Sequence, residues 1–546
     1  MSCPSPLSLS LSLSLSPLPS PPFSLLRSLD HPAFSVILSL RSLSVLSLSL
    51  SLSPMRFFIN CGAEEEITTG GIKWLTDEGF VAGGNRSAVA TPGIAATLAT
   101  LRFFPDAAAK KNCFVVPVTK GATYLVRTTY FYGGFDGGAT PPCFDQIVGG
   151  TRWSTVNTSG DYTRGLASYY EVVVRAAAKT LSVCLARNGR STAAPFISAL
   201  EVAALEDSIY NSTDLDGHLL ATVARHRFGH AGAITSYPED PFNRYWEPFP
   251  AGDGDPVVES HANVSAAGLW NLPPAAAFQR GITASRGKPV VLRWPPVELP
   301  PATYYVALYF QDNRTPSPFS WRVFDVSLNG EPFYPGLNVS ATGVMVFSGD
   351  WPLSGKTEIT LTPAPESPVG PVINAGEVLQ LVPRKGRTVT RDVIAMEELA
   401  RSLTNVPADW NGDPCLPWET AWTGVECSRG KLARVVSLNL TRWGLTGTLP
   451  EGINNMTALT SIWLGGNMIS GPIPDLGSLQ QLVSLRLEDN QLSGPIPPSL
   501  GSLMEIREIF LQNNDLQGAI PQSLTARSGI NIQISPGNNK ITALRP

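Results

Sequence analysis

Ile197-Ser-Ala-Leu-Glu-Val-Ala-Ala-Leu205 recurs later in the chain as Ile373-Asn-Ala-Gly-Glu-Val-Leu-Gln-Leu381, with five of nine positions identical. Two further matches stand at nearly the same offset: Thr123-Tyr124 recurs as Thr303-Tyr304, and Phe144-Asp145 recurs as Phe324-Asp325. Three matches at nearly one offset indicate a duplicated unit of about 160 residues. Alternating segments such as Thr357–Thr362 are typical of strands with one buried face. The sequence therefore predicts tandem β-sandwiches, joined near residues 206–235.

The composition excludes several classes of protein. The 546 residues carry a net charge of −4, and a chain without a basic excess is not expected to bind nucleic acid. Charged residues make up only 15%, while glycine and proline number 48 each. This balance favours short strands and many turns over a helical bundle.

Residues 1–54 consist largely of Leu-Ser repeats, and two interpretations stay open. Phe34–Leu52 has 11 apolar residues in 19 and a single charge, which suits the core of a signal peptide. Alternatively, a dinucleotide tract translated in frame produced the repeats, and the native signal peptide is altered or missing. Because no other stretch reaches 18 consecutive apolar residues, the sequence predicts no transmembrane helix.

An ordered series of motifs follows Met55. They are Phe58-Ile-Asn-Cys-Gly62, Tyr124-Leu-Val-Arg127, Phe131-Tyr-Gly-Gly-Phe-Asp-Gly137, Trp153-Ser-Thr-Val156, Pro195-Phe-Ile-Ser-Ala-Leu-Glu201, Tyr237-Pro-Glu-Asp240 and Arg244-Tyr-Trp-Glu-Pro248. Residues 55–384 thereby resemble the plant malectin-like extracellular domain. The resemblance implies two malectin-type β-sandwiches, about 55–210 and 216–384, with a carbohydrate-binding ancestry and a role at the cell surface.

The loop Tyr130–Gly138 is the candidate carbohydrate site of the first lobe. Aromatic rings stack on sugar faces and a carboxylate accepts hydroxyl hydrogen bonds, so Tyr130, Tyr132, Phe135 and Asp136 are the candidate residues. A purely structural turn is the alternative. Four cysteines of this lobe allow three pairings, which the sequence leaves open: Cys61, Cys113, Cys143 and Cys184.

Residues 385–430 form a linker. Val393, Met396, Leu399 and Leu403 recur at helical spacing, which predicts an amphipathic helix that Pro407 ends. Cys415 and Cys427 bracket a tryptophan-rich loop and are expected to form a local disulfide. The segment resembles the N-terminal cap of plant leucine-rich repeats, which covers the open apolar end of a solenoid.

Residues 431–546 repeat with a nearly constant period of about 24 residues. The first apolar positions are Val435, Leu459, Leu482 and Ile506, and the turn positions are Trp443, Asn467, Asn490 and Asn514. This is the leucine-rich repeat pattern, in its plant-specific Gly-x-Ile-Pro form. The asparagines are expected to form a ladder that Trp443 interrupts, and a degenerate fifth unit has Asn538 one place late.

Strand side chains alternate between faces, so one residue of each repeat points from the concave strand to solvent. Aligning the repeats gives a column of Asn439, Trp463, Arg486 and Phe510, flanked by Thr441, Gly465, Glu488 and Gln512. Trp and Arg are enriched at interface hot spots, and two glycines beside Trp463 should leave its ring accessible. We hypothesise that Trp463, Arg486 and Phe510 bind a partner.

Eight Asn-x-Ser/Thr sequons predict a glycosylated, secreted protein. They stand at Asn85, Asn157, Asn211, Asn263, Asn313, Asn338, Asn439 and Asn455.

No nucleotide-binding, kinase or nucleophile-elbow motif is found. His226 and His230 stand four residues apart in a non-helical context, which argues against a metal pair. Carboxylates such as Glu239, Asp240 and Glu247 leave a glycosidase pair open, although their segment favours a structural role. We therefore expect no catalytic residue, no cofactor and no metal.

The expected fold class is mostly β: tandem malectin-type β-sandwiches followed by a short leucine-rich-repeat solenoid. The chain resembles plant malectin-like leucine-rich-repeat receptor-like proteins without a kinase. That resemblance implies a non-catalytic extracellular recognition protein. Its expected partners are a cell-wall glycan or glycosylated ligand, and a receptor kinase or peptide. The alternatives are a wall protein without sugar specificity and a carbohydrate-active enzyme.

Overall fold

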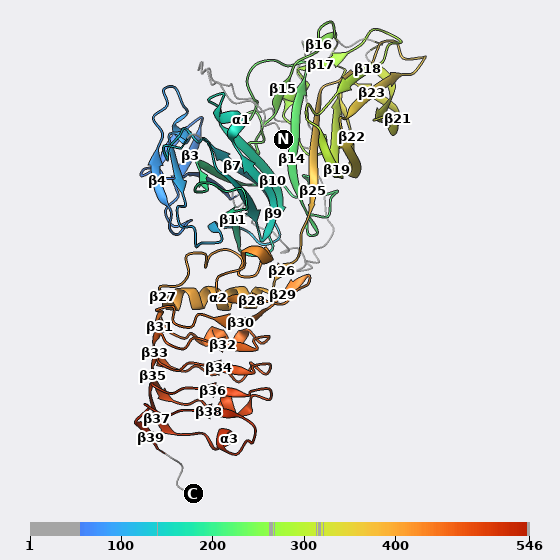
Figure 1. Cartoon of the computed structure of the whole chain (residues 1–546). Coiled ribbons are helices and arrows are strands. Elements are labelled where there is room, and N and C mark those ends of the chain that lie inside the picture. The colour runs from blue at the N-terminus through green and yellow to red at the C-terminus, as the bar shows by residue number, and fades with distance from the viewer. Residues whose placement is uncertain are drawn as a thin grey trace, which may run out of the picture.

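The chain folds into two β lobes that lie side by side, with a solenoid stacked beneath them (Figure 1). The computed structural model describes residues 55–542 except 139, 261–265, 267, 313, 315–317 and 320. The leader 1–54 and the sequons at Asn263 and Asn313 lie outside the described residues. The predicted fold class is confirmed. In the described part, no helix has the length and apolar character needed to cross a membrane.

The first lobe packs a large sheet against two smaller sheets. Its strands in the large sheet are β2 (Ile67–Thr69), β3 (Ile72–Thr76), β1 (Arg56–Asn60), β13 (Ala199–Ala204), β7 (Thr123–Tyr130) and β10 (Ser168–Arg175). The smaller sheets are β6 (Asn112–Pro117), β11 (Thr180–Arg187), β8 (Cys143–Val148) and β9 (Thr151–Asn157), and β12 (Phe196–Ile197), β5 (Thr100–Phe103) and β4 (Asn85–Ala88). A short helix, α1 (Ser159–Tyr162), follows β9. Val126, Val172 and Phe144 are among the buried side chains that fill the space between the sheets.

The second lobe repeats this plan. Its strands in the large sheet are β14 (His218–Phe228), β15 (Glu247–Phe249), β25 (Ala375–Pro383), β19 (Leu299–Phe310) and β22 (Val344–Gly355). Its smaller sheets are β18 (Val290–Arg293), β23 (Glu358–Pro363), β20 (Trp321–Leu328) and β21 (Glu331–Ser340), and β16 (Val257–Glu259), β17 (Arg280–Thr283) and β24 (Val372–Ile373). Tyr124 on β7 and Tyr304 on β19 occupy matching strands, as do Phe144 on β8 and Phe324 on β20. The duplication inferred from the sequence is therefore confirmed.

The two lobes share one sheet of 11 strands, joined where β10 meets β14. Only two register pairs make this junction, Val172 with Ala221 and Val173 with Leu220. By contrast, β14 pairs with β25 of its own lobe along nearly its whole length. So short a backbone contact leaves the joint dependent on side chains.

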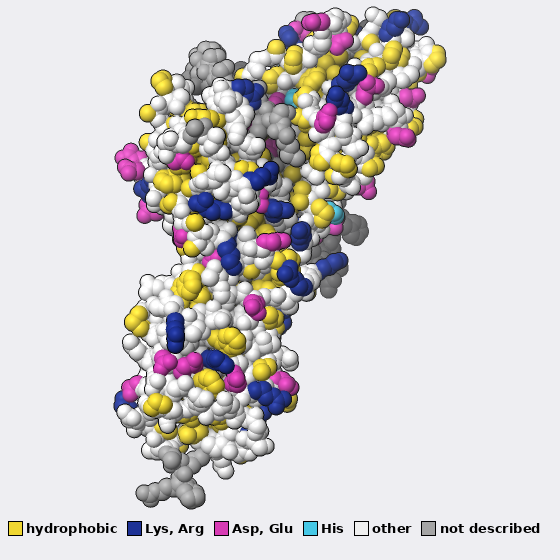
Figure 2. All heavy atoms as spheres, in the orientation of Figure 1, with side chains coloured by type: hydrophobic (Ala, Val, Ile, Leu, Met, Phe, Trp, Pro, Cys, Tyr) yellow, Lys and Arg dark blue, Asp and Glu magenta, His cyan; other side chains and the backbone are white. Residues whose placement is uncertain are grey.

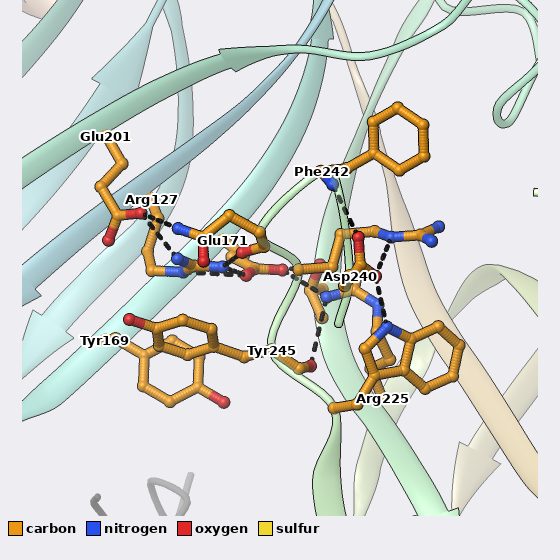
Figure 3. Close-up of polar contacts among 12 residues, drawn as sticks. Arg127, Tyr169, Glu171, Glu201, Arg225, Asp240, Phe242 and Tyr245 are labelled. Atoms are coloured by element: carbon orange, nitrogen blue, oxygen red, sulfur yellow. Dashed lines mark hydrogen bonds and ion pairs between the residues drawn. The ribbon is translucent and has the colours of Figure 1, made fainter. Parts of the chain in front are cut away.

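Five buried charged side chains alternate in sign across the joint, and Figure 3 labels four of them, Arg127, Glu171, Glu201 and Arg225. Arg127 Nη1 donates to Glu201 Oε2 at 2.8 Å, and Arg127 Nε donates to Glu171 Oε2 at 2.9 Å. Arg225 Nη1 donates to the other oxygen of Glu171 at 2.6 Å, and Arg225 Nε donates to Glu377 Oε2 at 2.8 Å. Glu201 and Glu377 are the glutamates of the repeated nonapeptide. The duplicated motif thus supplies both ends of a charge chain that crosses from lobe to lobe.

The position of each glutamate in this chain sets its pKa. Burial raises the pKa of Glu171, but Arg225 and Arg127 outweigh burial and lower it to about 2. Glu201 has one arginine partner, Arg127, and a hydrogen bond from Asn243 Nδ2, and burial raises its pKa. The contribution of Glu171 to stability is present above its unfolded pKa of 4.5 and is lost as pH falls towards 2.

The linker folds as a cap over the solenoid. Helix α2 (Thr390–Ser402) buries Met396 and Leu399, as the spacing predicts. Two short strands precede and follow it, β26 (Arg387–Thr388) and β27 (Leu403–Thr404). Cys415 and Cys427 form a disulfide, and the nearby rings of Trp410 and Trp422 stack with centroids 5.2 Å apart.

The cap also packs against the first lobe. The Nζ of Lys111, on the loop that enters β6, donates to the backbone carbonyls of Asp413 and Leu416. Burial lowers the pKa of Lys111 to about 8. Cys113 and Cys184 form the second disulfide, and a Cβ on Gly412 would lie only 2.7 Å from Cys113 Sγ. Cys61 and Cys143 are unpaired, which resolves the pairing that the sequence left open.

The solenoid is built from two sheets whose strands are parallel, except that the cap-side strands β27 and β28 pair antiparallel with their neighbours. One contains β28 (Val425–Cys427), β30 (Val435–Asn439), β32 (Ser461–Trp463), β34 (Ser484–Arg486), β36 (Glu508–Phe510) and β38 (Asn531–Gln533). The other contains β27, β31 (Thr446–Thr448), β33 (Met468–Pro472), β35 (Gln491–Pro495), β37 (Asp515–Ala519) and β39 (Lys540–Thr542). The remaining elements are β29 (Leu432–Ala433), which pairs with β26, and the short helix α3 (Gln522–Thr525).

The predicted asparagine ladder is present and extends into the fifth unit. The Asn490 side chain accepts from the backbone N–H of Ile469 and donates to carbonyls of its own and the preceding coil, and Asn467 and Asn514 do the same. Asn538 joins them by accepting from Leu516 N–H. The turn before Asn538 absorbs the extra residue seen in the sequence, so the ladder stays in step.

Arg127→Met should lower the free energy of unfolding by about 3–5 kcal/mol, because Glu171 and Glu201 would lose a buried counter-charge. The measurement is urea unfolding at pH 7. The matched control is Arg152→Met, because the Arg152 side chain is 62% exposed and its partner Asp145 keeps hydrogen bonds from Thr155 and Asn188, so this ion pair should contribute at most about 1 kcal/mol. Equal losses in the two variants would contradict a dependence of the lobes on the buried charge chain.

Cys427→Ser should lower the stability of the secreted protein by about 3 kcal/mol, the loop-closure contribution for a loop of this size. Cys143→Ser is the control and should change little, since Cys143 forms no disulfide. Thermal unfolding compares the variants, and intact-mass thiol labelling checks the bond. Finding both Cys415 and Cys427 reactive in the native protein would contradict the pairing.

Candidate functional site

The predicted carbohydrate loop is mostly buried. Tyr130, the last residue of β7, has no exposed surface, and its hydroxyl donates to Gln146 Oε1 at 2.9 Å. Tyr132 is 2% exposed and its hydroxyl donates to Asp136. Neither ring offers a face to a sugar. The burial of both rings therefore argues against sugar stacking on them, and their carbohydrate role stays a prediction.

The two other residues of this candidate do not form a site without the tyrosines. Phe135 is half-buried, with its ring 5.1 Å from that of Phe103 and 5.4 Å from that of Phe196. Asp136 is exposed, but it accepts from the Tyr132 hydroxyl and from the backbone N–H of Gly138. The loop is thus a structural turn in which Asp136 closes the chain onto the core.

Two of the three carboxylates that left a glycosidase open, Asp240 and Glu247, are held in structural contacts, whereas Glu239 is exposed. Asp240 is fully buried and accepts from Arg244 Nε at 2.8 Å and from Trp246 Nε1 at 2.7 Å (Figure 3). Glu247 accepts from the hydroxyl of Tyr169, and burial raises its pKa to about 7. A carboxylate fixed by an arginine and an indole is not free to exchange a proton with a substrate.

The two histidines of the i, i+4 pair have separate partners. His226 Nδ1 accepts from Trp294 Nε1 at 3.1 Å, whereas His230 Nδ1 contacts Arg227 at 3.2 Å. Burial lowers the pKa of each imidazole to about 4. Within the described residues, no group of three or more His, Cys, Asp or Glu side chains is arranged to hold a metal ion.

A hollow of about 430 Å³ lies beside the joint, where the sequence predicts no site. Arg56, Glu206 and Glu239 provide charges of both signs along its lining, and Phe242 and Pro273 are among its apolar residues. Its residues come from β1, from the end of β13 and the two residues after it, and from two loops of the second lobe that contain Phe242 and Pro273. Such a discontinuous lining has no signal in the sequence.

The aromatic column of the solenoid lies where the repeats predict it. In the parallel register Asn439 pairs with Trp463, Trp463 with Arg486, and Arg486 with Phe510. Arg486 Cζ lies 5.1 Å from the ring centroid of Trp463 and 5.0 Å from that of Phe510. The guanidinium is therefore held between two aromatic rings, a favourable cation–π arrangement. The column continues to Gln533, which the alignment of four repeats does not include.

A second row of side chains holds this stack in place. Trp463 Nε1 donates to Ser484 Oγ at 2.9 Å, and Ser484 Oγ donates to Glu508 Oε2 at 3.0 Å. Arg486 Nη2 donates to the same Glu508 oxygen at 3.0 Å, and this hydrogen bond lowers the pKa of Glu508. Ser484 and Glu508 are absent from the sequence-based candidates. Their position two residues before Arg486 and Phe510, on the same strand face, is the signal that identifies them.

The surroundings of Trp463 differ from the prediction in one respect. The two glycines beside it do not leave open space, because neighbouring side chains cover them. A Cβ on Gly465 would lie 2.6 Å from Glu488 Oε1, and one on Gly466 would lie 2.7 Å from Arg442 Cγ. Trp463 is therefore half-buried, held in one orientation by its surroundings.

All six sequons within the described residues have exposed asparagines. Asn439 points to solvent from its strand, as predicted, and its Oδ1 accepts from the backbone N–H of Thr441. Attachment of a glycan at any of the six remains a prediction.

Comparison with known proteins places these elements in a family. The Malectin-like domain matches residues 59–381, and the Leucine Rich Repeat matches residues 481–503. A probable LRR receptor-like serine/threonine-protein kinase of Arabidopsis thaliana is 30% identical over 480 residues, which cover 81% of this chain and 49% of the relative. A putative receptor-like protein kinase of the same plant is 30% identical, over 71% of this chain and 44% of the relative. The chain thus spans about half the length of these relatives.

Solved structures agree on the fold of the lobes. The ANX2 ectodomain from Arabidopsis thaliana superposes with a TM-score of 0.51 at 14% identity, covering 60% of this chain and 97% of that one. FER, solved in complex with the plant peptide RALF23 and LLG2, superposes with a TM-score of 0.50 at 18% identity and covers 60% of this chain and 95% of that one. At these identities the likeness extends to the fold alone. Because the family model matches more than half of its residues, the chain belongs to the malectin-like family, with leucine-rich repeats following the malectin-like domain.

Proposed function

We propose that the chain is a non-catalytic extracellular recognition module that binds a protein or peptide partner on the concave sheet of its solenoid. The single observation that carries this proposal is the Trp463–Arg486–Phe510 stack, half-exposed on a regular sheet and fixed by Ser484 and Glu508. A binding surface whose side chains are already ordered loses less entropy when it binds. Tryptophan and arginine are also the residues most enriched at interface hot spots.

The polar groups beside the stack indicate what a partner should offer. Glu488 Oε2 and Gln512 Oε1 are shielded from solvent and have no hydrogen-bond partner in the structure. Both are acceptors, so the complementary group is a donor such as a peptide N–H, an ammonium or a hydroxyl. A peptide with a basic or amide-rich segment next to an apolar residue satisfies both the acceptors and the rings.

The family supports the extracellular setting. The matched relatives are receptor-like kinases, and the matching structures are ectodomains of plant receptor kinases. One of these, FER, was solved with a peptide and a second protein. A peptide or receptor-kinase partner for this chain is a proposal by analogy, and so is secretion. The two disulfides are consistent with an oxidising compartment.

Carbohydrate binding by the malectin-like lobes is the second candidate, supported by the family fold but weakened by burial of the predicted tyrosines. A panel of cell-wall oligosaccharides and a peptide library, both presented to the secreted protein, separate the two. Saturable binding to glycans alone would favour the lobes, and turnover of any glycan would favour an enzyme. Binding to neither panel would leave a structural wall protein as the better description.

Trp463→Ala should weaken peptide or protein binding by about 2 kcal/mol or more, roughly thirtyfold, because it removes the ring that covers Arg486. Calorimetry on the tightest-binding library peptide gives the dissociation constants. Trp443→Ala is the matched control, since Trp443 is 45% exposed but stands at the turn position outside the concave column. Unchanged affinity in a Trp463→Ala, Phe510→Ala double variant that keeps its thermal stability would refute the proposed surface.

A further inference from the structure

Two exposed aromatic rings lie nearly parallel at the edge of the second lobe. Trp270 and Phe347 are 43% and 40% exposed, with their planes 9° apart and their centroids separated by 6.0 Å. Parallel rings this far apart are offset rather than eclipsed, so each leaves part of one face open to solvent. Tyr305, which is buried, lies against Phe347 at 6.2 Å with an angle of 23° between the rings. The pair thus forms a firm apolar platform, called here the Trp270–Phe347 platform.

The platform stands on an edge strand. Phe347 belongs to β22, the last strand of the 11-stranded sheet, which lies beside β19 in Figure 1. In the space-filling view, hydrophobic side chains are scattered widely over the surface of this lobe (Figure 2). Exposed edge strands with large apolar side chains are sites of unwanted pairing unless something covers them. The structure offers a candidate cover close to the platform.

The sequon Asn211-Ser-Thr213 is anchored on both sides beside this platform. Before it, the backbone N–H of Tyr210 donates to Asn271 Oδ1 at 2.9 Å, and Asn271 directly follows Trp270. Within it, directly after Asn211, the carbonyl oxygen of Ser212 would lie 3.2 Å from a Cβ on Gly349, two residues beyond Phe347 on β22. Asn211 itself is exposed between these two contacts. The backbone on either side of Asn211 is therefore placed beside the neighbours of Trp270 and Phe347.

We propose that an N-linked glycan on Asn211 packs its first sugars onto the Trp270–Phe347 platform. The apolar face of an N-acetylglucosamine ring presents C–H groups that cover an aromatic ring, while its hydroxyls and acetamide remain in water. Because the glycan is tethered beside the platform, its effective concentration there far exceeds that of any free saccharide. Burial of the exposed apolar surface favours the packed state. The proposal rests on passage through the secretory pathway, which is part of the proposed function.

Another sequon shows why an aromatic neighbour alone is insufficient. Asn439 pairs in register with Trp463, but Arg486 already covers one face of that ring. The Trp270–Phe347 platform has no such cation in the described structure. Among the exposed sequons, Asn85 lies on β4 at the edge of the first lobe and provides the reference for an unpacked glycan.

The test uses the secreted protein made with uniform high-mannose glycans and digested by endoglycosidase H under native conditions. Site-specific glycopeptide mass spectrometry follows Asn211 and Asn85 in the same sample. The Asn211 glycan should be released about tenfold more slowly, a factor that corresponds to one aromatic stacking contact. In Trp270→Ser and Phe347→Ser, both sites should remain occupied and the two rates should become equal.

Equal release rates in the wild-type protein would overturn the proposal without needing either variant. An unoccupied Asn211 beside an occupied Asn85 would also overturn it, while leaving secretion intact. Absence of glycan from every sequon would instead remove the secretory setting on which the proposed function depends. As an independent readout, Asn211→Gln should lower the melting temperature and Asn85→Gln should not. Equal melting temperatures would argue against a packed glycan.

Discussion

The alternation of buried charges from Glu201 through Arg127, Glu171 and Arg225 to Glu377 is the constraint on which the rest of the molecule depends. Two β-sandwiches that share only two register pairs of backbone would otherwise be free to pivot. Each buried charge must keep its partner within hydrogen-bond distance, because an unpaired buried charge strongly destabilises the fold. Their geometry therefore fixes one relative orientation of the lobes. The loop between β14 and β15, which contains the Asp240–Arg244 ion pair, covers these charges by accepting hydrogen bonds from Arg127 and Arg225.

That fixed orientation positions the surfaces where binding is proposed. The cap leaves the second lobe at β25 but packs under the first lobe, so the direction of the solenoid depends on both. The concave column is then held by local contacts, from Ser484 and Glu508 to the rings they orient. The relative orientation of the lobes thus depends on buried ion pairs, whereas the proposed recognition surface is ordered by local hydrogen bonds between neighbouring repeats.

The sequence predicted features that repeat and missed features that do not. The column of Trp463, Arg486 and Phe510 could be predicted because repeats of nearly equal length place equivalent side chains in register on neighbouring parallel strands. The glutamates at both ends of the charge chain were likewise visible in the repeated nonapeptide. Their arginines were not, since the position opposite Glu377 that corresponds to Arg127 is Ala307, and Arg225 lies on a different strand. The burial of Tyr130 could not be predicted, because the rings that cover it, Phe144 and Phe196, come from distant strands that no local pattern reveals.

The cap has a further consequence for how the molecule responds to load. Covalently it continues from the second lobe, and through Lys111 and the Gly412 contact it is seated on the first lobe, which is joined in turn to the second by the shared sheet. Each of the three bodies, the two lobes and the capped solenoid, is therefore connected to both of the others. A pull on the solenoid cannot swing one lobe away without also straining the cap seat or the charge chain. A partner bound to the solenoid would thus act on both lobes together.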